Sequence, residues 1–132
     1  MRIVLDTNVV VSAFLSPEGK PAAILKMVLH DELDICINTA ILVEYEQVLN
    51  RAKFSGKISS SSLQRFSEIL YEIGTRIDCI PSINDLPDET DRKFYDTAKS
   101  ADAILVTGNK KHYPDESFIQ DPDEFLSRTL FM

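Results

Sequence analysis

The sequence predicts one α/β domain, residues 1–132, built around a mostly parallel β-sheet. Two observations indicate this fold class. Short apolar runs typical of buried strands alternate with longer segments whose apolar residues recur at helical spacing. In addition, two helical segments separate the first two strands, an order that favours parallel strands joined by right-handed crossovers. The length of 132 residues and the 44% hydrophobic content suit a single domain with a sizeable core.

The first part of the chain is predicted to contain two strands and two helices. Residues 3–5 form an apolar, β-branched run, which predicts a buried strand. The dense apolar segment 9–15 predicts a short buried helix that ends before Pro17. A second helix is expected over 21–33, because a proline suits its first position, and residues 35–37 predict the second strand.

Two more helices are expected in the middle of the chain. Residues 40–49 carry an apolar stripe at helical spacing, and Asn38 or Thr39 can act as the N-cap. Ser61 has the spacing of a capping box and is expected to begin a fourth helix that Gly74 ends.

The last part of the chain repeats the alternation of strands and helices. A third strand is expected over 75–80, a helix over 88–100 and a fourth strand over 103–106. Residues 118–119 predict a short edge strand, and residues 122–130 a closing helix.

Composition narrows the classes of function. The net charge of −7 argues against a protein that holds nucleic acid through a broad basic surface. It does not exclude a metal-dependent nuclease, because carboxylates gathered around a cation are themselves acidic. No apolar run reaches the roughly 18 residues of a membrane span, so a soluble, cytoplasmic protein is expected. Cys36 and Cys79 lack metal-site spacing, which favours reduced core residues.

Three carboxylates fall at equivalent places in this predicted topology. Asp6 follows the first strand, Glu44 lies early in the helix after the second strand, and Asp91 lies in the first turn of the helix before the fourth strand. Because the carboxyl ends of parallel strands share one edge, we expect these side chains to meet in one pocket. All-oxygen ligation is typical of Mg²⁺ or Mn²⁺. The sequence therefore predicts metal-assisted hydrolysis, with a phosphodiester as the expected substrate.

Each of these acids also has a simpler interpretation. Asp6 can cap the helix that follows it, and Glu44 can be an ordinary solvated helix residue. Asp91, with its neighbours Asp88 and Glu89, can interact favourably with the positive end of a helix dipole. The residues alone leave these alternatives open.

Basic residues flank the predicted site. Lys110 and Lys111 follow the fourth strand and Arg92 follows Asp91, positions from which they could contact the phosphates beside the cleaved bond. The alternative is solvated surface charge. Asp96 lies about 140° around the helix from Asp91, which makes it a metal-ligand candidate of second rank.

Three stretches carry a resemblance to a known family. The segments LDTNV, LVEYEQVL and DETDRKFYDTAKSADAILVTGNKKHYP resemble a PIN domain, especially the small bacterial PIN proteins described as toxin components of toxin–antitoxin pairs. The resemblance covers nearly the whole chain in order. It implies a Rossmann-like three-layer α/β/α sandwich and an endoribonuclease that depends on Mg²⁺ or Mn²⁺. It also implies RNA as substrate, a cognate antitoxin protein as partner and a homodimer.

The resemblance assigns roles residue by residue. Asp6, Glu44 and Asp91 match the three core acids of the family, which implies that they are the catalytic residues and metal ligands. Asn8 and Thr107 match polar positions that support the site.

The chain departs from the family pattern at Asn109, where many PIN domains have an acid. A neutral amide can ligate a metal through its carbonyl oxygen, but it contributes no charge and cannot act as a base. This departure weakens the case for a second metal. Asp96 matches an accessory acid found in part of the family, and our hypothesis is that it supplies the missing charge as a metal ligand.

Two other readings compete with a ribonuclease. Asn109 motivates a catalytically weak PIN-like module that binds RNA or a protein partner. A phosphatase of the haloacid dehalogenase type would need a second aspartate two residues after Asp6, where this chain has Asn8.

Overall fold

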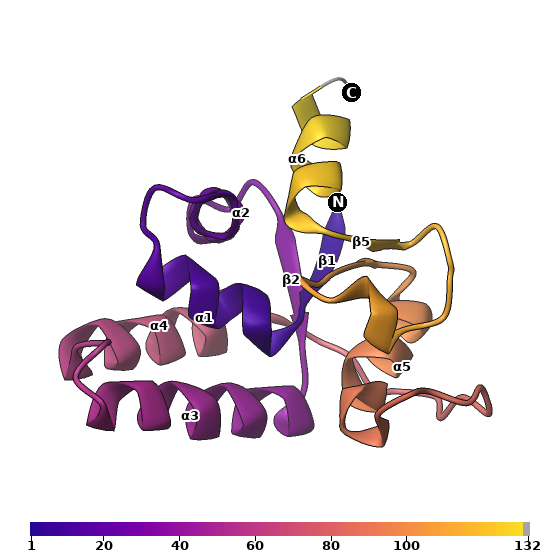
Figure 1. Cartoon of the computed structure of the whole chain (residues 1–132), viewed down its shortest axis with the longest axis horizontal. Coiled ribbons are helices and arrows are strands. Elements are labelled where there is room, and N and C mark those ends of the chain that lie inside the picture. The colour runs from indigo at the N-terminus through magenta and orange to yellow at the C-terminus, as the bar shows by residue number, and fades with distance from the viewer. Residues whose placement is uncertain (131–132) are drawn as a thin grey trace.

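In the computed structural model, which describes residues 1–130, the strands form one parallel sheet (Figure 1). The strand order is β3-β2-β1-β4-β5, and each pairing is parallel. The α/β fold class with a parallel sheet is therefore confirmed. The strands are β1 (Arg2–Leu5), β2 (Asp34–Ile37), β3 (Thr75–Arg76), β4 (Ile104–Val106) and β5 (Ile119–Gln120).

Strand β1 is the centre of the sheet. Ile3, Val4 and Leu5 are fully buried, and β1 pairs with β2 on one side and β4 on the other. A strand that is apolar on both faces must be covered by helices on both sides. The carboxyl end of β1 therefore opens at the middle of one edge of the sheet, and Asp6 is the next residue.

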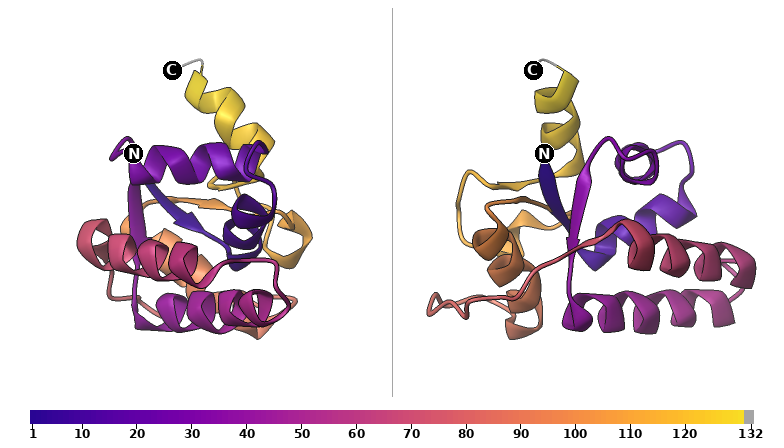
Figure 2. Two further views of the ribbon diagram at one scale, coloured as in Figure 1. Left: turned by 90° about the vertical axis from the view of Figure 1, so that its left-hand side faces the viewer. Right: turned by 180° about the vertical axis from the view of Figure 1, so that it is seen from behind.

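Helices cover both faces of the sheet (Figures 1 and 2). Helix α5 packs against β1, β2 and β4, whereas α1 to α4 lie on the other side of β1 and β2. This is the three-layer arrangement expected of the fold. The helices are α1 (Thr7–Leu15), α2 (Lys20–Leu29), α3 (Thr39–Phe54), α4 (Ser60–Ile73), α5 (Arg92–Ala101) and α6 (Pro122–Leu130), with short 3₁₀ turns η1 (Glu89–Asp91) and η2 (Lys110–His112).

The third strand is much shorter than predicted. The prediction of a strand over 75–80 is wrong beyond Arg76, although the Ile77 N–H still donates to the Ile37 carbonyl at 2.9 Å. The reason is that β2 ends at Ile37, so later residues of this segment meet no further backbone partner in that strand. The chain from there to α5 instead extends away from the sheet beside α5 (Figure 1 and the right-hand view of Figure 2).

Helix boundaries also differ from the predictions. Helix α4 is capped by Ser59, whose side chain accepts from the Ser62 N–H, rather than beginning at Ser61. Helix α3 continues to Phe54, five residues beyond its predicted end, whereas its N-cap, Asn38, is one of the two candidates. The predicted helix 88–100 divides into η1 and α5, which places Asp91 at the junction between them.

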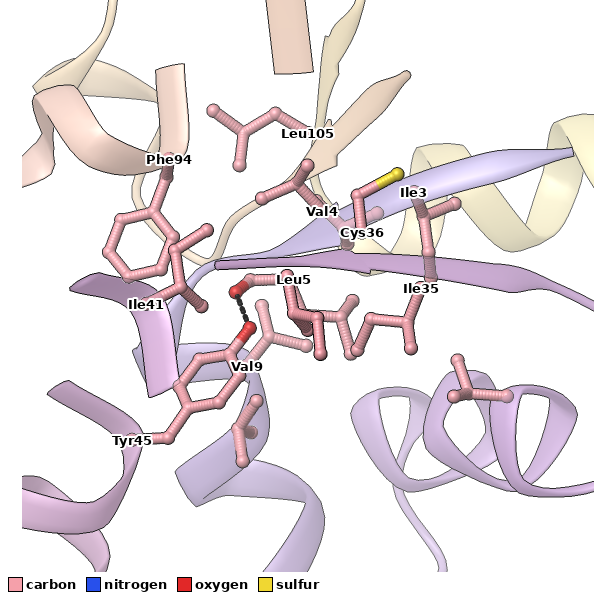
Figure 3. Packing of buried hydrophobic residues seen from close by; sticks show 14 of the residues in the cluster. Ile3, Val4, Leu5, Val9, Ile35, Cys36, Ile41, Tyr45, Phe94 and Leu105 are labelled. Carbon is pink, nitrogen blue, oxygen red and sulfur yellow. Dashed lines mark hydrogen bonds between the residues drawn. The ribbon is translucent and has the colours of Figure 1, made fainter. Parts of the chain in front are cut away.

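The core is joined to the end of β1 by a buried tyrosine. Tyr45 of α3 packs near Phe94 and Ile41, and its hydroxyl donates a hydrogen bond to the Leu5 carbonyl (Figure 3). Burial raises the pKa of Tyr45, so the hydroxyl keeps its proton and remains a donor. Because Glu44 precedes Tyr45 and Asp6 follows Leu5, this bond holds the backbones of two candidate site residues together.

Two smaller predictions can be compared with the structure. Cys36 and Cys79 are both free thiols within the described residues; Cys36 is buried in β2, whereas Cys79 lies outside the strands. Across residues 1–130, none of the helices is long and apolar enough to cross a membrane.

We predict that Gly74→Ala destabilises the fold by about 1–3 kcal/mol, because the close packing at the end of α4 leaves no space for a methyl group. A Cβ at Gly74 would lie 2.4 Å from Cδ1 of the buried Ile37 and 2.6 Å from the Leu70 carbonyl oxygen. The measurement is the free energy of unfolding in urea. Ile37→Val removes the closest atom, so the double variant should lose less stability than the sum of the two single variants. Full additivity would contradict this clash.

Candidate active site

Asp6 is a buried carboxylate held at the end of the central strand. It is 5% exposed, and its Oδ2 accepts hydrogen bonds from the Thr107 hydroxyl at 2.9 Å and the Tyr113 hydroxyl at 2.8 Å. Burial raises the pKa of Asp6, and these two hydrogen bonds oppose the shift. Asp6 occupies the N-cap position of α1, but within residues 1–130 its side chain makes no capping hydrogen bond. Its carboxylate is held by the ends of other segments instead.

Glu44 is held by partners on both of its oxygens. Its Oε1 accepts a hydrogen bond from the Lys93 ammonium at 2.7 Å, and its Oε2 accepts one from the Thr7 hydroxyl. The Glu44 and Lys93 side chains are each 24% exposed, so this is a half-buried ion pair. Glu44 is therefore not a solvated helix residue.

Asp91 is the third acid of the group and lies at the junction of η1 and α5. Its side chain is 14% exposed, and His112 Nδ1 lies 3.2 Å from its Oδ2. That oxygen is buried and accepts no hydrogen bond from any residue between 1 and 130. Burial raises the pKa of Asp91 from 3.8 to about 6, and the charges of Asp6, Asp88 and Glu44 contribute in the same direction while His112 opposes them.

The donor chemistry fits a hard divalent cation. Asp6, Glu44 and Asp91 come from three separate segments and lie near enough for the charge of Glu44 to raise the pKa values of Asp6 and Asp91, and for the charge of Asp6 to raise that of Asp91. The buried, unpartnered Oδ2 of Asp91 is an available ligand atom. However, no group of three His, Cys, Asp or Glu side chains in the described chain is arranged to hold a metal.

The polar residues predicted to support the site lie around Asp6. Thr107 donates to Asp6 and accepts from the Asn109 N–H at 3.0 Å. The Oδ1 of Asn8 accepts from the Gly108 N–H at 2.9 Å, which joins the start of α1 to the segment after β4. A Cβ at Gly108 would lie 3.2 Å from that oxygen, so a glycine allows this close approach.

Asn109 is used differently from the acid that it replaces. Its Nδ2 lies 2.9 Å from His112 Nε2, and the other ring nitrogen of His112 faces Asp91. Because an amide NH₂ can only donate, Nε2 is the acceptor and the ring proton lies on Nδ1. The Asn109 side chain therefore orients a histidine toward Asp91.

The structure does not bring all the predicted residues to the three acids. Asp96 instead lines a hollow beside the start of α3. Arg92 uses its five N–H groups in hydrogen bonds to Glu89, Ser82 and Asn84. Lys110 pairs with Glu124 in an exposed ion pair, and Lys111 is exposed.

Three residues that hold the acids were not assigned these roles from the sequence. Thr7 lies between Asp6 and Asn8, and Lys93 follows Arg92, but neither sequence position indicates a hydrogen bond to Glu44. Tyr113 lies seven residues after the end of β4, and its sequence position gives no signal that it returns to Asp6.

Comparisons with known proteins agree with this fold. Residues 2–111 match the family model described as "PIN domain". The uncharacterized protein MJ1680 of Methanocaldococcus jannaschii is 25% identical over 127 residues, which cover 96% of this chain and 79% of that protein.

Two solved structures share the fold. The structure of PAE2754 from Pyrobaculum aerophilum matches with a TM-score of 0.61 and 19% identity, over 99% of this chain and 90% of that one. The structure of VapBC2 from Rickettsia felis, bound to a DNA fragment from their promoter, matches with a TM-score of 0.60 and 19% identity, over 92% of this chain and 98% of that one.

We predict that Asp91→Asn stabilises the metal-free protein at pH 7. The carboxyl pKa of about 6 in the fold, against 3.8 ordinarily, means that folding disfavours the charged form. This group therefore makes the wild type lose stability as the pH rises from about 4 to about 6. Asparagine removes that loss. It should increase the free energy of unfolding by about 1–3 kcal/mol and raise the melting temperature in EDTA by several degrees.

The matched control for this prediction is Asp88→Asn. Hydrogen bonds from Thr90 lower the pKa of Asp88, so its replacement should give no gain in stability. A lower melting temperature for Asp91→Asn at pH 7 would contradict the unfavourable burial and repulsion of the Asp91 charge.

Proposed function

The chain belongs to the PIN domain family, and on that premise we propose that it is a divalent-metal-dependent endoribonuclease. In this proposal it hydrolyses phosphodiester bonds of RNA in the cytoplasm, with Mg²⁺ or Mn²⁺ as cofactor. The observation that carries the proposal is the convergence of Asp6, Glu44 and Asp91 at one sheet edge, where the pKa values of Asp6 and Asp91 are raised. Acids that are costly to bring together without a cation are typical of a functional site.

Asp6, Glu44 and Asp91 are the residues that would hold the cation. When bound, a divalent ion lowers the pKa of water to give a nucleophile and stabilises charge on the phosphate. Thr107 and Tyr113 hold the Asp6 carboxylate in one orientation by donating to Oδ2. Burial and the charge of Asp6 raise the pKa of Tyr113, so its hydroxyl stays protonated and continues to donate.

The remaining residues divide between orientation and substrate contact. His112, oriented by Asn109, carries a proton on Nδ1 toward Asp91 and limits the positions that this carboxylate can take. Lys111 is exposed next to this histidine and is the better placed of the predicted cations to contact a phosphate, because Arg92 and Lys110 are already paired. Asp96 as an accessory ligand remains a hypothesis.

We further propose that the protein is the toxin of a toxin–antitoxin pair, with a cognate antitoxin protein as partner, and that it forms a homodimer. The sequence resemblance to small bacterial PIN toxins supports this role. The fold shared with VapBC2, a complex bound to promoter DNA, agrees with it.

A second candidate function is a catalytically weak module that binds RNA or a protein partner. Two observations favour it: Glu44 is already paired with Lys93, and Asn109 supplies no negative charge to the site. Cleavage and metal binding distinguish the two functions.

We predict that Asp6→Asn and Glu44→Gln reduce Mn²⁺-dependent cleavage of single-stranded RNA by about two orders of magnitude or more, because each removes a charged ligand of the cation. The measurement is the initial rate on a mixed RNA pool, with EDTA as the blank. Glu46→Gln is the matched control, because Glu46 lies on the exposed face of the same helix, and its rate should equal that of the wild type. Equal rates for Asp6→Asn and the wild type would favour the binding module.

We also predict that Mn²⁺ raises the melting temperature of the wild type by several degrees, since a ligand at 100 times its Kd stabilises the folded state by about 2.7 kcal/mol. The shift should be much smaller for Asp91→Asn and Glu44→Gln and unchanged for Glu46→Gln. This measurement needs no RNA and separates metal binding from catalysis. A full shift in both ligand variants would show that Mn²⁺ binds elsewhere.

A further inference from the structure

A hollow lies beside the candidate active site. It has a volume of about 400 Å³ and lies between the first turn of α3, the segment after β3, and α5. This volume falls within the usual range for small-molecule sites, roughly 300–1,000 Å³. Lys93 lines the hollow, and its ammonium pairs with Glu44. A ligand in the hollow would therefore adjoin the three acids.

The hollow contains a buried carboxylate without a donor. Asp96 is 5% exposed, and its Oδ1 is buried with no hydrogen-bond partner among the described residues. Arg92 is near enough for Asp96 to raise the pKa of its guanidinium, but its five N–H groups are used by other residues. Buried polar atoms are nearly always hydrogen-bonded, and the described protein residues supply no donor to this oxygen, which leaves it available to a donor from a molecule in the hollow.

The same hollow also offers donors and positive charge. Thr39 and Ala40 line it and provide the first N–H groups of α3, which have no acceptor inside their own helix. The positive end of the helix dipole and the Lys93 ammonium both disfavour a cation here. The ligand that fits is therefore neutral, with hydrogen-bond donors for Asp96 and an acceptor for the helix N–H groups.

We propose that this hollow binds a guanine base of the RNA, next to the phosphodiester that is cleaved. Guanine presents N1–H and N2–H as adjacent donors, which match a carboxylate, and O6 beside them as an acceptor for the N–H groups of α3. Adenine and cytosine each place one amino donor beside a ring-nitrogen acceptor. Uracil places one N–H between two carbonyls. Only guanine offers Asp96 two donors, and this assignment rests on the ribonuclease function proposed above.

The first test measures nucleotide binding without metal. In EDTA, calorimetry with GMP, AMP, CMP and UMP should show GMP binding about tenfold or more tightly than the others, the discrimination expected of a bidentate contact. Asp96→Asn should abolish this preference, because an amide offers only one acceptor. Asp102→Asn is the matched control, since this exposed residue ends the same helix in a left-handed conformation that asparagine accepts. Equal affinity for the four nucleotides would overturn the proposal.

A second variant distinguishes loss of the guanine contact from a folding defect in Asp96→Asn. Ala40→Leu fills the hollow from the exposed first turn of α3 without changing Asp96, and it should also lose the GMP preference. If Asp96→Asn weakens Mn²⁺ binding as strongly as Asp91→Asn does, then Asp96 is a metal ligand and the guanine assignment is wrong.

The second test maps the cleavage sites in a random single-stranded RNA pool. The wild type and Asp102→Asn should both show guanine enriched at one fixed position beside the cleaved bond, and Asp96→Asn and Ala40→Leu should lose the enrichment. Cleavage that depends on Asp6 but shows no guanine preference would overturn the guanine assignment and would still support the ribonuclease function. GMP binding that depends on Asp96, without any cleavage that depends on Asp6, would support guanine binding in the hollow and contradict the ribonuclease function.

Discussion

The burial of one carboxylate at the end of the central strand is the constraint on which the rest of the site depends. Asp6 is 5% exposed, and a charge in such a place is unfavourable unless donors surround it. The donors come from the two residues that the chain brings back to it, Thr107 at the end of β4 and Tyr113 after η2. The pairing of β1 with β4 is therefore needed to keep the carboxylate in place. The geometry of the site thus depends directly on the geometry of the sheet.

A second requirement is the balance of charge around Asp6. Glu44 and Asp91 would repel it, and each faces a basic group from a different segment: Lys93 for Glu44 and His112 for Asp91. The basic groups do not cancel the cost of these charges, since burial first and the charges of Asp6, Asp88 and Glu44 second still raise the pKa of Asp91. A fold that keeps such a group at a sheet edge loses stability there, which is a common property of sites kept for chemistry rather than for folding.

The sequence predicted the features that depend on local pattern and less well those that depend on partners. The apolar run before Asp6 and the helix stripes identified the sheet, the helices and the end of the sheet where the acids meet. The length of β3 could not be predicted, because it is limited by the end of β2 and not by its own residues. Likewise, Ser59 and Ser61 are equally good cap residues by type, and the sequence does not distinguish Ser59, which caps α4 by accepting from the Ser62 N–H. The roles of Thr7 and Tyr113 depend on contacts across the fold, which no spacing encodes.

Asn109, which departs from the family pattern, has a different role from the acid found there in many PIN domains. Taken alone, an amide in place of an acid removes a ligand. In the structure, its NH₂ group binds His112, and the imidazole in turn faces Asp91. An aspartate there would accept a proton from the imidazole instead of donating to it. It would also add a fourth negative charge beside three acids of which two, Asp6 and Asp91, already have raised pKa values. With asparagine, the negative charge is limited to Asp6, Glu44 and Asp91, and one of these is already paired with Lys93. In the proposed enzyme, this smaller charge favours one divalent ion over two, because a second ion would have fewer carboxylates to offset its own charge.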